Sequence, residues 1–167
     1  MNLRIIPMCN LVSILQVMQQ LLHSITMSKT GPIILIEDDI DDQEIFREAI
    51  NEIGVKNELI CFATTFEAYK FLQKMVGQPF LIFCDVNLPM QSGLDFKRQV
   101  DNFPELKRKS IPFLFYSTSV DKKSVTEAYT EMTIQGFFLK ESNYTDIISK
   151  LKVILEYWNA CEHPSNF

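Results

Sequence analysis

Three acidic residues that could act together follow two apolar runs of this 167-residue chain. Glu37 and Asp38 come directly after the run 33–36, and Asp85 comes directly after the run 80–84. Two carboxylates about 4 Å apart repel each other by roughly 4 kcal/mol at an effective dielectric constant near 20. Three that converge therefore need protons or a divalent cation, and a set of oxygen ligands suits Mg²⁺ rather than zinc. The alternative is that Glu37 and Asp38 only begin a solvated helix, where acids are favoured by the helix dipole.

A hydroxyl and an ammonium group stand at equivalent positions after two later apolar runs. Ser117 follows the run 113–116, and Lys140 follows the run 136–139. Taken alone, such a serine is usually a helix cap and such a lysine is usually on the surface. Together they would supply the donors and the positive charge that bind phosphoryl oxygens. An aspartate facing them could attack a phosphorus atom activated by Mg²⁺ and become an aspartyl phosphate.

The elements that must position these residues alternate between strands and helices. Each apolar run has the length of a buried strand and is followed by a stretch with helical periodicity, which predicts a parallel sheet covered on both faces. Right-handed crossovers leave few strand orders, and the common one is 2-1-3-4-5, with ligands bound beyond the carboxyl ends of the strands. We therefore predict a doubly wound (βα)5, flavodoxin-like α/β sandwich of three layers. The predicted strands are 33–36, 59–63, 80–84, 113–116 and 136–139.

The charge of −5 is local rather than general. Residues 37–52 hold eight acids and one arginine, so this segment carries −7 and the rest of the chain sums to +2. The chain lacks the basic footprint of a nucleic-acid binder, and no apolar run reaches the 18 or more residues of a membrane span. We interpret Asp39, Asp41 and Asp42 as the solvated surface of a helix. The four cysteines form no C-x-x-C pair, which indicates reduced thiols in a cytoplasmic protein.

The first 28 residues differ in composition from the rest of the chain. They are apolar with one charge, Arg4. A secretory signal and an amphipathic docking helix are alternatives, and we favour Met27 as the natural start. The predicted organisation is an N-terminal extension at 1–28, one domain at 29–160 and a C-terminal tail at 161–167.

From Pro32 to about Trp158 the chain resembles the response-regulator receiver domain of two-component signalling. The resemblance rests on the acidic pair Glu37-Asp38, the loop from Asp85 to Gly93, Ser117 and Lys140. The basic segment 106–112 and the closing residues 156–158 are more similar to the phytochrome-associated single-domain regulators than to the chemotaxis type.

The resemblance implies a role for each matching residue. Asp85 would be the phosphoacceptor, Lys140 would pair with the phosphoryl group, and Ser117 would swing toward it. Asp38, Asp85 and the main-chain carbonyl of Asn87 would bind Mg²⁺ directly, with Glu37 acting through water. Ser117 and Phe137 would form the switch that passes phosphorylation on to the protein surface. The side chains of Asn87 and Ser119 would tune the lifetime of the phosphoryl group.

The implied partners are proteins. A sensor histidine kinase or a histidine phosphotransfer protein would supply the phosphoryl group, since the predicted site holds no histidine. A downstream protein, which the sequence does not identify, would recognise the switched surface, and homodimerisation is left open. We expect self-catalysed phosphorylation and dephosphorylation without a separate output enzyme domain.

One departure from the family pattern bears on the site. The family usually has a proline in a cis bond after the lysine of strand five, and here the residue is Glu141. A cis bond before a non-proline residue costs about 2.5–4 kcal/mol, so we predict a trans bond and a rearranged loop.

Three other interpretations are weighed against the receiver. A phosphohydrolase of the haloacid-dehalogenase type would need a second aspartate where this chain has Asn87. A degenerate receiver would bind partners without phosphorylation, and only Glu141 favours it. A flavin-binding module is disfavoured because acids line the place where a phosphate would lie.

Overall fold

The computed structural model describes residues 29–119 and 121–162. The predicted extension at 1–28 and residues 163–167 of the predicted tail lie outside the described residues. No helix in the described ranges is long and apolar enough to cross a lipid bilayer.

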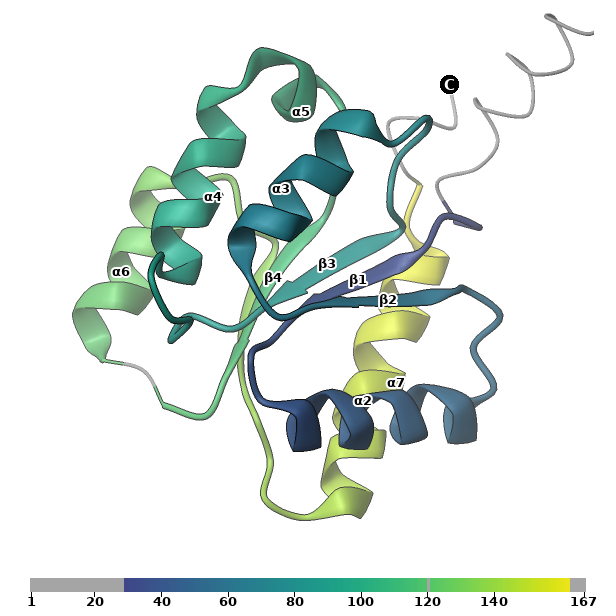
Figure 1. Cartoon of the computed structure of the whole chain (residues 1–167). Coiled ribbons are helices and arrows are strands. Elements are labelled where there is room, and N and C mark those ends of the chain that lie inside the picture. Colours follow the sequence, from purple (N-terminus) through teal and green to yellow (C-terminus); the bar gives the residue numbers. More distant parts are fainter. Residues whose placement is uncertain (1–28, 120, 163–167) are drawn as a thin grey trace, which may run out of the picture.

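Five parallel strands form one sheet in the order β2-β1-β3-β4-β5 (Figure 1). This confirms the predicted strand order, in which β1 and β3 are neighbours. The strands are β1 (Ile33–Ile36), β2 (Leu59–Phe62), β3 (Leu81–Cys84), β4 (Phe113–Ser117) and β5 (Gly136–Leu139).

Helices cover both faces of the sheet and complete the three predicted layers. Helices α3, α4 and α6 lie on one face, and α2 and α7 lie on the other (Figure 1). The short helix α5 was not predicted, because five residues are too few to show helical periodicity. The helices are α2 (Ile40–Ile53), α3 (Thr65–Lys74), α4 (Gly93–Asn102), α5 (Pro104–Arg108), α6 (Lys122–Glu131) and α7 (Tyr144–Ala160).

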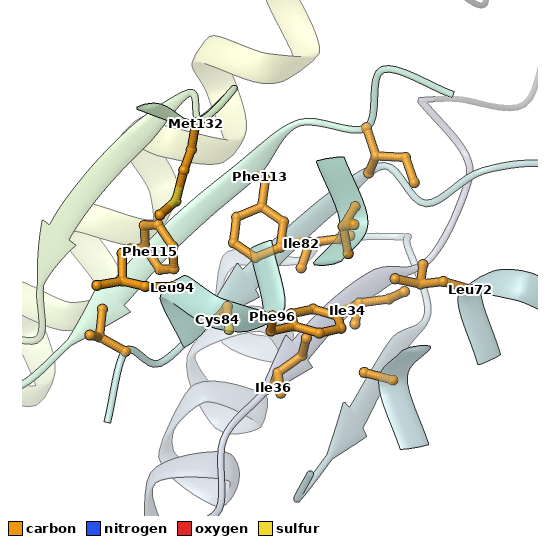
Figure 2. Close-up of a cluster of buried hydrophobic side chains, with 14 of the residues drawn as sticks. Ile34, Ile36, Leu72, Ile82, Cys84, Leu94, Phe96, Phe113, Phe115 and Met132 are labelled. Carbon is orange, nitrogen blue, oxygen red and sulfur yellow. The ribbon is translucent and has the colours of Figure 1, made fainter. Parts of the chain in front are cut away.

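The three central strands are apolar up to Ser117 at the end of β4, because both of their faces are buried. Every residue of β1, β3 and β4 is buried, and alternate side chains enter two separate core clusters. The cluster on the α3, α4 and α6 side includes Ile34, Ile82, Phe96 and Phe113 (Figure 2). The strand side chains that point to the opposite face pack with residues of α2 and α7 in the second cluster.

Local signals fix where two helices begin and end. The side chain of Thr64 accepts a hydrogen bond from the amide of Glu67, which confirms Thr64 as the cap at the start of α3. Helix α2 ends at Gly54, whose φ of 78° is the left-handed conformation that glycine adopts without strain. Because Thr64 lies just beyond the end of β2, α3 begins at the carboxyl edge of the sheet.

Candidate functional site

Glu37 and Asp85 lie side by side because their strands are neighbours in register. Ile36 is opposite Cys84, and the amide of Asp85 donates to the carbonyl of Ile36 at 2.9 Å. The two residues that follow these strands are only 2% and 6% exposed, respectively. The sheet therefore brings Glu37 and Asp85 of the three predicted carboxylates into one buried place, whereas Asp38 is exposed.

The ammonium group of Lys140 lies among three carboxylates. Its Nζ is 2.5 Å from Glu37 Oε2, 2.6 Å from Asp42 Oδ2 and 3.1 Å from Asp85 Oδ2. Lys140 follows β5 at the same edge of the sheet, and its side chain is 9% exposed. The structure thus directs the Lys140 side chain toward the acidic residues, although the residue after it is Glu141 rather than proline.

Asp42 is the residue of this group that sequence reasoning missed. We had interpreted it as part of a solvated helix surface, whereas its side chain is 35% exposed and bound to Lys140. Asp42 lies in the first turn of α2 and faces the end of β5. It is 98 positions from Lys140 in the sequence. The cluster of acids near the start of α2 was the available signal, but it could not tell which acid would turn inward.

Burial sets the charge balance of this group. Burial raises the pKa of Glu37 to about 7, and the Lys140 ammonium only partly offsets that rise. Burial acts to lower the pKa of Lys140, but hydrogen bonds to Asp42 and Glu37 outweigh it, so that pKa is raised. With all four groups ionised, three carboxylates and one ammonium leave a net charge of −2.

The other carboxylate oxygen of Asp85 is held by one donor at the end of β4 and one in the loop after β3. Oδ1 accepts hydrogen bonds from the Ser117 hydroxyl at 2.5 Å and from the Asn87 amide at 3.0 Å. The Asn87 side-chain nitrogen donates to the Ser117 hydroxyl at 3.2 Å and to the carbonyl of Ser119 at 3.3 Å. Four of the predicted site residues thus form one connected network.

A close backbone contact fixes the loop that carries Asp85. Gly93 begins α4, and its amide donates to the carbonyl of Val86 at 2.9 Å. A Cβ on Gly93 would lie 2.1 Å from the carbonyl oxygen of Asp85. Only glycine fits there, which gives a physical reason for Gly93 in this loop.

The residues present fit a divalent cation in chemistry and charge. Glu37, Asp38, Asp85 and the Asn87 carbonyl offer oxygen ligands only, and the three carboxylates around Lys140 outnumber its single ammonium group. Asp38 is exposed at the end of β1. Among the described residues no preformed cluster of three acids surrounds a cation position, and Lys140 supplies the counter-charge in this arrangement.

The two aromatic residues of β5 point to opposite faces, as predicted. Phe137 packs with the α3, α4 and α6 cluster, and its ring centroid is 5.2 Å from that of Phe115. Phe138 packs with the opposite cluster. The amide of Phe137 also donates to the hydroxyl of Tyr129 on α6 at 3.2 Å, which links β5 to that helix.

The peptide bond between Lys140 and Glu141 is trans, which confirms the prediction for the loop without proline. A cavity of about 270 Å³ lies beside this loop. It is lined by Asp42, Ile45 and Phe46 of α2 together with Lys140 and Glu141. The site is therefore open to the space between α2 and the β5–α7 loop.

This parallel fold, with an aspartate held between a lysine and a hydroxyl at the carboxyl edge of the sheet, defines a class of signalling domain. Residues 33–152 match the family described as the response regulator receiver domain, and the chain belongs to that family. Membership excludes the phosphohydrolase and flavin-binding interpretations as descriptions of its family.

Known relatives place the chain near the phytochrome-associated regulators. It is 28% identical to response regulator Rcp1 of Synechocystis sp. over 131 residues, covering 75% of this chain and 87% of that protein. It is similar to the phosphorylated cyanobacterial phytochrome response regulator RcpA, with 26% identity, a TM-score of 0.71 and coverage of 80% and 98%. The Mn²⁺-bound form of Rcp1 matches with 26% identity, a TM-score of 0.70 and coverage of 80% and 99%.

Proposed function

We propose that this receiver domain accepts a phosphoryl group on Asp85 from a sensor histidine kinase or a histidine phosphotransfer protein. The observation that carries the proposal is the double hold on Asp85, whose two oxygens contact Lys140 on one side and Ser117 on the other. The solved structures of phosphorylated RcpA and Mn²⁺-bound Rcp1 support it by similarity.

The proposed chemistry is a phosphoryl transfer to a carboxylate. An Asp85 oxygen forms a bond to phosphorus while the bond from phosphorus to the donor breaks, and the donor leaves with the electron pair. Lys140 offsets negative charge on the phosphoryl oxygens, and the Ser117 hydroxyl donates a hydrogen bond to one of them. The Asn87 and Ser119 positions border this space and would set how long the phosphoryl group survives.

Magnesium completes the proposed site. Asp38, Asp85 and the Asn87 main-chain carbonyl would hold Mg²⁺, with Glu37 acting through water. The ion would supply positive charge to the transferring group when bound. Glu37 and Asp85 remain two carboxylates that share one lysine, so the metal would also reduce their mutual repulsion.

The output would be a change of surface on α6, β5 and α7. In the proposed switch, a phosphoryl group on Asp85 draws in Ser117, and Phe137 fills the space that Ser117 vacates. Phosphorylation then favours the state in which these contacts are best made. A downstream protein, or a second copy of the chain, would recognise that state.

The three described cysteines are free, which supports a reducing, cytoplasmic location.

Phosphorylation of Asp85 can be tested directly. The purified protein is incubated with Mg²⁺ and acetyl phosphate, and the product is analysed by intact mass spectrometry and by acid and base treatment. We expect an acid-stable, base-labile adduct that Asp85→Asn abolishes. Asp95→Asn, which changes an exposed aspartate of α4, is the matched control and should be phosphorylated like the wild type.

The second candidate function is protein binding without phosphorylation. It is favoured by the ion pairs of Lys140, which satisfy the site without a metal, and by Glu141 in place of proline. The same experiment separates the two functions, because a wild-type protein that takes no phosphoryl group under these conditions would support the second.

A further inference from the structure

Lys150 of α7 contacts the residues on both sides of Lys140. Its Nζ donates a hydrogen bond of 2.7 Å to the main-chain carbonyl of Leu139 and forms an ion pair with the carboxylate of Glu141. The amide of Lys140, between them, donates to the carbonyl of Ser117 at 2.9 Å. One ammonium group therefore restrains the loop immediately before and after Lys140, while a strand hydrogen bond restrains Lys140 itself.

Restraint of this loop matters because three carboxylates compete for Lys140. Its Nζ is closer to Glu37 and Asp42, at 2.5 and 2.6 Å, than to Asp85, at 3.1 Å. The lysine stem is flexible, so the backbone fixes only the point from which it starts and thereby which carboxylates its ammonium can reach. A small rotation of this backbone could leave the ammonium on Glu37 and Asp42 and remove it from Asp85.

We propose that Lys150 is a positioning residue that keeps Lys140 within reach of Asp85. In this chain it takes over the conformational restraint that a proline ring at position 141 would impose on the backbone. The inference rests on the proposed function, in which Lys140 stabilises the phosphoryl group on Asp85. Neither contact of Lys150 involves the metal ligands, which lie at the ends of β1 and β3.

The test compares substitutions of two lysines on the same helix. Lys150→Met removes the ammonium and keeps an aliphatic side chain, whereas Lys150→Arg keeps the charge. Lys152→Met is the matched control, because the Lys152 side chain is 58% exposed. Its Nζ lies 3.9 Å from Glu156 Oε1, which is too far for a hydrogen bond. Phosphorylation of Asp85 by acetyl phosphate is measured at saturating Mg²⁺, and the Mg²⁺ concentration for half-maximal rate is measured separately.

We expect Asp85 of the Lys150→Met variant to be phosphorylated about tenfold more slowly than in the wild type. This decrease is smaller than the roughly hundredfold loss of rate that a misplacement of about 1 Å can cause. Lys150→Arg should recover most of the rate, and Lys152→Met should match the wild type. The half-maximal Mg²⁺ concentration should not change, whereas a general loosening of the fold would alter both quantities. Equal rates for Lys150→Met and Lys152→Met would overturn the proposal.

Crystal structures of the wild type and of Lys150→Met make the result independent of phosphorylation. We expect Lys140 Nζ to leave hydrogen-bonding distance of Asp85 in the variant and to stay on Glu37 and Asp42. An unmoved Lys140 would overturn the positioning role even if the rates differ. A wild-type protein that is never phosphorylated would refute the proposed function, and the two structures would still decide whether Lys150 positions Lys140.

Discussion

Replacing Gly93 by alanine tests whether the close contact beneath Asp85 holds the site in place. The added Cβ would lie 2.1 Å from the Asp85 carbonyl oxygen, about 1.3 Å inside the 3.4 Å at which ordinary contact begins. It would also lie 3.1 Å from the Cys84 sulfur. Both neighbours are buried, and the nearer one is backbone, so the chain must move by about 1 Å to accept the methyl group.

Two effects of different size follow from this displacement. Overpacking of a buried site costs about 1–3 kcal/mol, and we expect a value near 3 kcal/mol because backbone atoms must move. A misplacement of about 1 Å at a reacting group can lower a rate by about 100-fold. We therefore expect Gly93→Ala to be less stable and to be phosphorylated on Asp85 about 100-fold more slowly per folded molecule.

Urea denaturation and phosphorylation by acetyl phosphate measure the two effects. Gly54→Ala is the matched control, because its Cβ would meet nothing within 4 Å but its φ of 78° disfavours alanine. That left-handed conformation costs alanine roughly 1–2 kcal/mol, so the control should lose stability and keep the wild-type rate. A Gly93→Ala protein with wild-type stability and rate would refute the reasoning.

Three further substitutions test single interactions. Lys97 is 3% exposed and pairs with Asp101 at 2.7 Å, so Lys97→Met should lower the free energy of unfolding. We expect a loss of about 2 kcal/mol in urea denaturation, less than the 3–5 kcal/mol of a fully buried pair, because Asp101 keeps 17% exposure; an unchanged midpoint would contradict this. Burial raises the pKa of Tyr116 to about 12 from 10, so its contribution to stability is present below about pH 10 and is lost as the pH rises toward 12. Tyr116→Phe should remove the last phenolate step from an absorbance titration and flatten the alkaline part of the stability curve; retention of that step would assign it to another tyrosine. Thr64→Ala removes the cap of α3 and should cost about 1 kcal/mol, and Thr64→Ser should restore most of it in thermal unfolding.

Local features of the fold could be predicted because their causes lie within a few residues. The runs 33–36 and 136–139 predicted β1 and β5 with the bounds that the structure has. Residues 33–36 are apolar throughout because β1 is buried on both faces, whereas Leu139 at the end of β5 is 49% exposed. Thr64 and Gly54 predicted the start of one helix and the end of another. Helix α5 escaped because its five residues carry no periodic signal.

The site was predictable only to the level of strand ends. Topology alone brings the residues at the carboxyl ends of β1, β3, β4 and β5 to one edge, which is why Glu37, Asp85, Ser117 and Lys140 were found. The direction of each side chain was not predictable. Asp42 was expected on a solvated helix surface, and its carboxylate binds Lys140.

The sequence by itself determined the fold, the family and the edge of the sheet at which chemistry would occur, because apolar patterning and short motifs act locally. Only the tertiary structure decided which side chains contact each other at that edge. Lys140 divides its charge among three carboxylates, and Lys150 holds the loop where proline is missing. Such contacts join residues as many as 103 positions apart, and they depend on side-chain directions that no local pattern encodes.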